Sequence, residues 1–161
     1  MERRIRTLFA GGLLALTLFA TAIAGQLVDG WLAYQRGDYA EALRIWGQLA
    51  DQGLAGAQFD LGFMYANGQG VPQDYEQALF WYREAADQGY AYAQDEVGSM
   101  YAKGQGVPQN YEQAYIWFNM AASHEGEATI PAKNRDDVAA KMTPDQIAEA
   151  QRIAREWKLT K

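Results

Sequence analysis

The chain repeats itself with a period of 36 residues. When residues 57–89 are laid over residues 93–125 without a gap, 19 of the 33 positions are identical. The identical positions include the string GQGVPQ, which stands at 68–73 and again at 104–109. Self-similarity at this period is typical of solenoids, in which each repeat is one supersecondary unit that packs on its neighbours. We therefore expect a row of stacked units.

The second half of each unit has the pattern of an amphipathic helix. Apolar residues recur at helical spacing from Tyr75, and the same stripe begins again at Tyr111 and, one period upstream, at Tyr39. Each stripe is preceded by a residue that can cap a helix, with Glu or Gln three positions later: Asp38 with Glu41, Asp74 with Gln77, and Asn110 with Gln113. Three copies of one helix are therefore predicted.

The first half of each unit is predicted to be a shorter helix, at 57–66 and at 93–102. Gly62 and Gly98 lie inside these helices, where glycine costs helix propensity, so we expect another helix to approach closely there. The first unit departs from the pattern. If Tyr34 is aligned with Tyr65, its leading helix spans about residues 26–34 and its loop, residues 35–38, is five residues shorter.

The pattern weakens after Ser123, and the remaining residues are predicted to cap the solenoid. We expect a loop at 126–131, a short helix at 133–142, and a last helix with Thr143 as its cap and Pro144 at its first position. The predicted fold is all-α, an antiparallel helix-pair solenoid of about three repeats with a C-terminal capping helix pair. Its expected parts are residues 25–56, 57–92, 93–125 and 126–161, after a separate segment at 1–24.

Residues 1–24 have the three parts of a secretory signal peptide. Arg3, Arg4 and Arg6 form a basic start, residues 8–20 are apolar, and residues 22–24 form a small-x-small cleavage site. We expect cleavage after Ala24, export to the periplasm or the medium, and no stable membrane insertion afterwards. The alternative is an uncleaved anchor, because residues 8–24 are at the short limit for a spanning helix.

The composition disfavours most forms of catalysis and the binding of nucleic acid. The chain has no cysteine and one histidine, which excludes disulfides, thiolate metal sites, cysteine nucleophiles and histidine-rich metal sites. Its net charge of −6 disfavours nucleic acid as a partner. We therefore expect no catalytic residues, no metal and no cofactor. The single histidine, His124, stands where Gln52 and Gln88 follow the earlier helices, so we expect it to cap a helix end at the surface.

The repeat resembles the Sel1-like repeats, relatives of the tetratricopeptide repeats. The family pattern is met in the first full repeat at Ala57, Leu61-Gly62, Tyr65, Gly68 to Val71, Asp74, Ala78, Trp81-Tyr82, Ala85-Ala86 and Gly89. The second copy matches most of these positions, and the first unit resembles an ordinary tetratricopeptide unit. The resemblance implies an exported bacterial adaptor that holds other proteins. A disulfide-rich branch is credited with penicillin binding or β-lactamase activity, and that activity is not carried over to a chain without cysteine.

In this architecture the leading helices line the concave side, so a binding face is sought there. The informative positions are those where the framework repeats and the side chain does not; they are Phe59, Asp60, Phe63, Tyr92, Asp95, Glu96 and Ser99. Phe59 and Phe63 are one helical turn apart and form a candidate apolar anchor beside acidic residues, which favour a basic protein or peptide as the partner. The alternative for both rings is simple packing against a neighbouring helix.

Three functions stay open from the sequence. The first is a non-catalytic exported adaptor that binds a protein or extended peptide through the concave face. The second is an envelope enzyme or cell-wall-acting hydrolase, for which the sequence offers no set of acid, base and nucleophile. The third is a purely structural, self-associating module.

Overall fold

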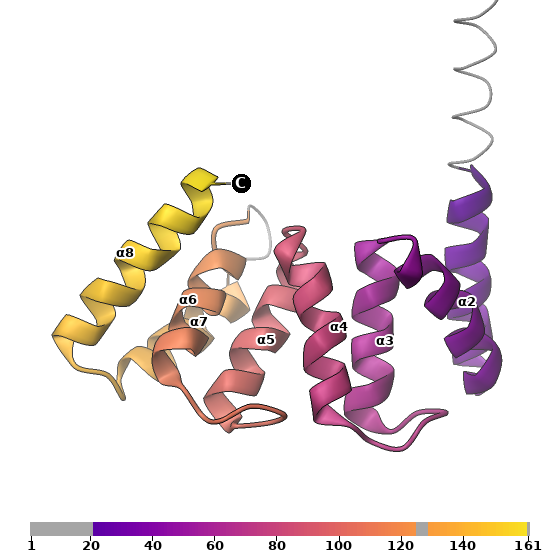
Figure 1. The fold of residues 1–161 in the computed structure, drawn as a ribbon, viewed down its shortest axis with the longest axis horizontal. Helices are drawn as coiled ribbons and strands as arrows, with labels where there is room; N and C mark the ends of the chain where they lie inside the picture. The colour runs from indigo at the N-terminus through magenta and orange to yellow at the C-terminus, as the bar shows by residue number, and fades with distance from the viewer. Residues whose placement is uncertain (1–20, 125–128, 161) are drawn as a thin grey trace, which may run out of the picture.

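The computed structural model describes residues 21–124 and 129–160, and all regular elements in these ranges are helices. A helix over residues 21–35 comes first, and seven labelled helices follow in a row (Figure 1). Their bounds are α2 Tyr39–Asp51, α3 Ala55–Asn67, α4 Tyr75–Asp87, α5 Ala91–Lys103, α6 Tyr111–Ala121, α7 Thr129–Ala139 and α8 Pro144–Thr160. The predicted all-helical solenoid is confirmed.

Up to α7 each helix packs mainly on its neighbours in the chain, whereas α8 packs on α6. Helices α3 and α4 pack on each other, as do α5 and α6, and α4 joins the two pairs by packing on α5. The buried side chains form two clusters, one from residue 33 to residue 64 and a larger one from residue 78 to residue 154. The core therefore consists of two clusters along the row, each built from successive local contacts, as expected of a solenoid.

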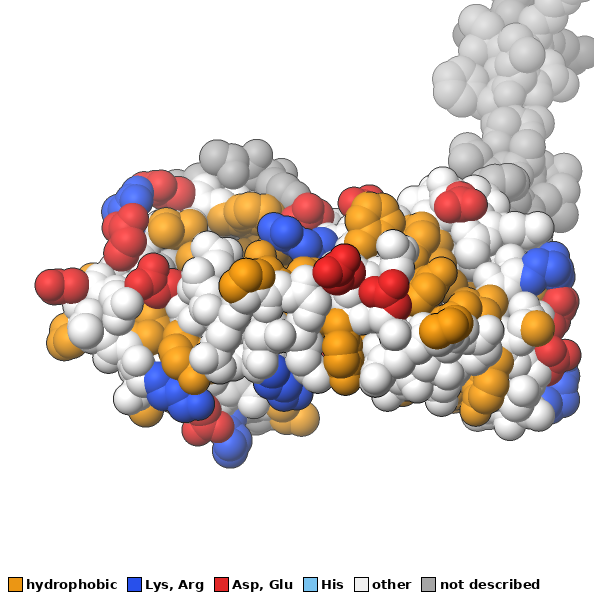
Figure 2. All heavy atoms as spheres, turned by 60° about the horizontal axis from the view of Figure 1, so that its bottom comes forward, with side chains coloured by type: hydrophobic (Ala, Val, Ile, Leu, Met, Phe, Trp, Pro, Cys, Tyr) orange, Lys and Arg blue, Asp and Glu red, His pale blue; other side chains and the backbone are white. Residues whose placement is uncertain are grey.

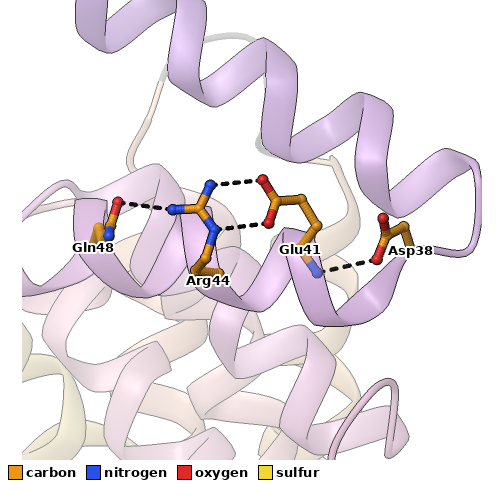
Figure 3. Close-up of polar contacts among 4 residues, drawn as sticks. All are labelled: Asp38, Glu41, Arg44 and Gln48. Atoms are coloured by element: carbon orange, nitrogen blue, oxygen red, sulfur yellow. Dashed lines mark hydrogen bonds and ion pairs between the residues drawn. The ribbon is translucent and has the colours of Figure 1, made fainter.

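The predicted helix caps are present at all three trailing helices. Asp38 accepts a hydrogen bond from the backbone N–H of Glu41, Asp74 from those of Glu76 and Gln77, and Asn110 from that of Gln113. In the first unit the Glu41 carboxylate does not return to the cap residue. It instead binds the Arg44 guanidinium through two hydrogen bonds of 2.7 and 2.6 Å, and Arg44 also reaches Gln48 (Figure 3).

The close approach of another helix that was predicted at Gly62 and Gly98 is confirmed, and the groups that approach are aromatic rings. A Cβ added to Gly62 would lie 2.6 Å from the ring of Tyr82, and one added to Gly98 would lie 2.7 Å from the ring of Phe118. Only a residue without a side chain permits this approach. Close packing of the two helices of a repeat therefore offsets the cost in helix propensity at these positions.

The first unit is aligned differently from the prediction. A Cβ on Gly30 would lie 2.4 Å from the ring of Trp46, so Gly30 is the counterpart of Gly62. The backbone N–H of Asp38 donates to the carbonyl of Ala33, just as that of Asp74 donates to the carbonyl of Tyr65. Ala33, not Tyr34, is therefore the counterpart of Tyr65. The first loop is consequently four residues shorter rather than five, and its leading helix extends beyond the predicted residues 26–34 at both ends.

The C-terminal helix pair covers the last repeat. Helix α7 begins at Thr129, four residues before the predicted start. Thr143 and Gln146 exchange two backbone-to-side-chain hydrogen bonds, of 2.9 and 3.3 Å, which forms the capping box predicted for α8. Buried Ala150 and Ala154 face the core, and the ring of Trp157 lies edge-on to Trp117, with centroids 5.7 Å apart. This packing hides the stacking face of α6.

Most of the predicted signal peptide, residues 1–20, lies outside the described residues. Residues 21–24, which include the expected cleavage site, are the first turn of the helix over 21–35. Among the described helices, none has the length and hydrophobicity to cross a lipid bilayer.

Candidate functional site

The predicted binding residues lie on two consecutive leading helices. Phe59, Asp60 and Phe63 belong to α3, and Tyr92, Asp95, Glu96 and Ser99 belong to α5. Below, this set is called the α3–α5 face. The structure assigns its members different surroundings, and these decide what each side chain is free to do.

Phe59 takes part in packing between two repeats. Its ring lies 5.5 Å from the ring of Tyr82, 5.4 Å from that of Tyr90 and 6.3 Å from that of Tyr92, measured between centroids. It is half-buried and contacts the larger core cluster. Phe59 therefore packs against neighbouring helices, which is the alternative given for it above. Its ring joins α3 to α4 and to the start of α5.

Phe63 and Tyr92 are the aromatic side chains that the face exposes. Phe63 keeps 38% of its surface exposed and meets the ring of Tyr34 edge-on at 6.3 Å, whereas Tyr92 is 54% exposed. Exposed aromatic rings held at one edge by other rings lose little side-chain entropy on binding, so they are suited to anchor a partner.

Asp60 and Glu96 both act electrostatically on the phenol of Tyr82. Burial raises the pKa of the Asp60 carboxyl to about 7. Burial, and then the nearby carboxylate of Asp95, raise the pKa of Glu96. The pKa of the Tyr82 phenol is raised chiefly by burial, with further contributions from Glu96 and Asp60, which places one carboxyl from α3 and one from α5 near this α4 side chain.

Within residues 21–124 and 129–160, neither Asp60 nor Glu96 has a basic partner at ion-pair distance. The ion pairs among residues 21–124 and 129–160 involve other carboxylates, on α2, α7 and α8. Lys103 lowers the pKa of Glu96 by its charge, but this effect is weaker than that of burial. The face therefore carries two partly desolvated carboxyl groups that make no ion pair within the described chain, and the charge of Lys103 offsets the burial of Glu96 only in part.

Asp95 has a structural partner. The side-chain amide of Asn134 on α7 donates a hydrogen bond of 3.0 Å to the Asp95 carboxylate. Burial raises the pKa of Asp95, while this hydrogen bond and the charge of Lys103 oppose the rise. Asp95 thus ties the last full repeat to the C-terminal cap. Ser99 is half-buried on the same helix, and its binding role stays a prediction.

The sequence analysis did not single out the buried glutamines Gln58 and Gln94. Both are 3% exposed, and each donates from its side-chain amide to the carbonyl at the end of the preceding trailing helix, at Ala50 and Ala86. Their identity in the two repeats was the available signal, because a polar residue on an apolar helical stripe needs a partner.

No metal site is formed by the described side chains, since no three His, Asp or Glu side chains gather within reach of one ion. Figure 2, seen from the side of the loops that join α3 to α4 and α5 to α6, shows hydrophobic patches between acidic and basic side chains. Neither sign of charge covers this view of the molecule continuously. The arrangement on α3, α4 and α5 is suited to accept a cation and an apolar group.

Comparisons with known proteins agree with this geometry. The model of the Sel1 repeat matches residues 55–90 and 91–125. A solved Sel1 repeat protein from Oxalobacter formigenes is 33% identical, with a TM-score of 0.63, over 78% of this chain and 98% of that one. The chain belongs to the Sel1 repeat family.

A second solved structure extends the comparison beyond the two matched repeats. It is a protective antigen present in uropathogenic Escherichia coli strains, with an SLR fold, and it is 29% identical with a TM-score of 0.78. The alignment covers 84% of this chain but 29% of the antigen, so the chain spans less than a third of that protein's length. A search of curated proteins finds no match. Membership of the Sel1 family suggests a protein-interaction scaffold, and such repeat proteins are typically not enzymes.

Proposed function

We propose that this Sel1 repeat protein is an exported, non-catalytic adaptor that binds a protein or an extended peptide through the α3–α5 face. The preferred partner carries a lysine or arginine beside an apolar side chain. Export rests on the three-part pattern of residues 1–24.

The observation that carries the proposal is the pair of partly buried carboxyl groups, on α3 and α5, that make no ion pair among the described residues. Removing a carboxylate from water costs free energy that an opposite charge at close range recovers. Asp60 and Glu96 carry this cost without an ion pair among the described residues. A cationic side chain from a partner would recover it, and charge complementarity of this kind gives specificity and fast association.

The exposed rings supply the apolar part of the same interaction. Phe63 lies one turn after Asp60 on α3, and Tyr92 lies one turn before Glu96 on α5. Each helix therefore offers an acidic group and a ring along one line. An extended peptide that crosses both helices would contact one acidic group and one ring on each of them.

A titration of the isotope-labelled protein with two peptides tests the proposal. One peptide alternates lysine with leucine, and its control has glutamate in place of lysine. We expect amide shifts concentrated on α3 and α5 with the lysine peptide, and their loss in a double variant, Asp60→Asn with Glu96→Gln. Equal shifts with both peptides, or shifts confined to other helices, would contradict it.

A further inference from the structure

The two ends of the solenoid present different surfaces to solvent. At the C-terminal end, α8 covers the last repeat and turns a charged side outward, on which Arg152 pairs with Glu149 and Glu156. At the other end the helix over 21–35 stands last in the row (Figure 1), and its outer side keeps large apolar side chains exposed. The end helices therefore differ in the chemistry of their outer sides.

The exposed apolar side chains of the helix over 21–35 form one stripe. Val28, Trp31 and Leu32 keep 56%, 50% and 43% of their surface exposed. They stand three and four residues apart, so they share one side of the helix. Gly30 and Ala33, which are buried against the first repeat, lie on the opposite side. A contiguous exposed apolar stripe of this kind is typical of an interaction surface.

The largest side chain of the stripe is held in place by the fold. The ring of Trp31 is stacked on that of Tyr34, with centroids 5.7 Å apart and planes 15° apart. Tyr34 in turn packs on the ring of buried Trp46, at 5.7 Å between centroids. Because its ring is already fixed, Trp31 loses little side-chain entropy on association.

Two opposite charges border the stripe along one edge. Asp29 and Arg36 are both exposed, and neither makes an ion pair in the described part of the chain. They stand seven residues apart, which is about two helical turns or about 10 Å along the axis, so they lie on the same edge. The backbone N–H of Arg36 still donates to the carbonyl of Leu32, and both charges line one groove with Leu32.

This arrangement of charges is complementary to itself. When two copies of the helix lie antiparallel about a two-fold axis, the same edge of each helix meets, and Asp29 of one copy lies opposite Arg36 of the other at two places. The axis then passes midway between positions 29 and 36, beside Leu32, which contacts its own copy. Head-to-tail stacking would instead place the apolar stripe on the charged outer side of α8.

We propose that the outer side of the helix over 21–35 joins two copies of this chain in a two-fold antiparallel dimer, with an Asp29–Arg36 ion pair on each side of the axis. The apolar stripe supplies the affinity, and the charges set the register. One helix from each copy makes a small interface, so a dissociation constant in the micromolar range is expected. The dimer goes beyond the function proposed for the α3–α5 face and does not depend on it.

Charge exchange tests the pairing, with sedimentation of the purified protein over a hundredfold range of concentration. The unchanged chain is expected to pass from monomer to dimer with no larger species, because a two-fold contact uses up the face. Asp29→Arg and Arg36→Asp each place like charges opposite one another at two places, so each is expected to weaken the dimer about tenfold or more. The two single variants, when mixed, are expected to form a heterodimer, and both changes in one chain are expected to restore the homodimer.

Introduced cysteines test the direction of the two helices, because the chain has no cysteine of its own. Leu32→Cys lies at the axis and is expected to form a disulfide-linked dimer on oxidation. Val28→Cys lies in the same stripe, but in an antiparallel pair its two copies are about 13 Å apart along the helices, beyond the reach of a disulfide. A parallel pair would crosslink at both positions and would overturn the proposed geometry.

A matched pair of variants separates this stripe from exposed apolar surface in general. Val28→Glu is expected to weaken the dimer about tenfold or more, whereas Ile130→Glu, at an exposed isoleucine of α7, is expected to leave it unchanged. Equal effects of the two, single charge variants that stay apart when mixed, or an unchanged chain that is monomeric throughout would overturn the proposal. Monomers that bind phospholipid vesicles through Trp31 would assign the stripe to a membrane and overturn it equally.

Discussion

At the scale of single residues, the positions that carry this fold are those where two helices approach most closely. Gly30, Gly62 and Gly98 each face the ring of an aromatic residue on the following trailing helix. The sequence predicted a close approach of another helix at Gly62 and Gly98, because glycine inside a helix costs propensity and needs a packing reason. It missed Gly30, since the shorter first loop shifts the alignment of the first unit.

Gly98→Ala is expected to destabilise the protein. Its Cβ would lie 2.7 Å from the ring of Phe118, which is itself buried and has no room to retreat. Overpacking outweighs the gain in helix propensity, so the free energy of unfolding should fall by about 1–2 kcal/mol. The control is Gly47→Ala in α2, where nothing lies near the added Cβ and an increase of about 0.5–1 kcal/mol is expected. Urea unfolding of both variants measures the difference, and a stabilised Gly98→Ala would refute the packing account.

Asp60 should make stability depend on pH. Its pKa is raised from 3.8 to about 7 in the folded chain, so between these values the folded state binds more protons than the unfolded state. Stability should therefore fall as pH rises from about 4 to 7, by on the order of 1–2 kcal/mol, and then level off. Asp60→Asn should reduce this slope, and the part that remains comes from Glu96 and Asp95, whose pKa values are also raised. Denaturant unfolding of both proteins at several pH values checks it, and identical pH profiles would show that Asp60 titrates as an exposed carboxyl.

At the scale of elements, the trailing helices follow directly from local sequence signals. Each begins one residue after a capping side chain that the sequence identified. The leading helices were less predictable. Helix α3 begins at Ala55 and α5 at Ala91, after Leu54 and Tyr90, which make no side-chain cap. Their starts depend on packing against the neighbouring repeat, which no local pattern reveals.

Removal of the cap of α4 gives a test of this distinction. Asp74→Ala deletes the acceptor of two backbone N–H groups and is expected to lower the free energy of unfolding by about 1 kcal/mol. Asp51→Ala is the matched control, because Asp51 ends α2, where a carboxylate gains nothing from the helix dipole. Thermal unfolding of both variants measures the difference. An equal loss of stability in the two would contradict a stabilising role for the cap.

The candidate site was only partly predictable, because local sequence patterns do not reveal packing between repeats. Differences between aligned repeats correctly located an acidic and aromatic set on α3 and α5. They did not show that Phe59 is held by three tyrosine rings or that Asp95 is bonded to Asn134 on α7. These contacts join residues 23 to 39 positions apart in the chain, and they follow from how the repeats stack.

At the scale of the whole molecule, stability should vary along the row. The larger buried cluster spans α4 to α8, whereas the helix over 21–35 keeps Val28, Trp31 and Leu32 exposed and packs on one side. In a solenoid each unit is stabilised chiefly by its neighbours, so units at an end open more readily.

Native-state hydrogen exchange should show this gradient. We expect the strongest protection in α4, α5 and α6, and weaker protection in the helix over 21–35 and in α2. Peptide-resolved exchange at neutral pH is the measurement. Uniform protection from the first helix to the last would mean that the chain unfolds only as one cooperative unit, contrary to the two-cluster core.

The central claim is that the α3–α5 face binds a basic partner, and site-specific photocrosslinking in the native host tests it most directly. A crosslinking amino acid replaces Phe63, and in a matched variant it replaces Phe80, an exposed phenylalanine of α4 outside this face. We expect position 63, and not position 80, to crosslink to one partner whose crosslinked segment carries lysine or arginine. Asp60→Asn with Glu96→Gln is expected to remove the product. Equal crosslinking at both positions, or a product that the double variant leaves unchanged, would contradict it.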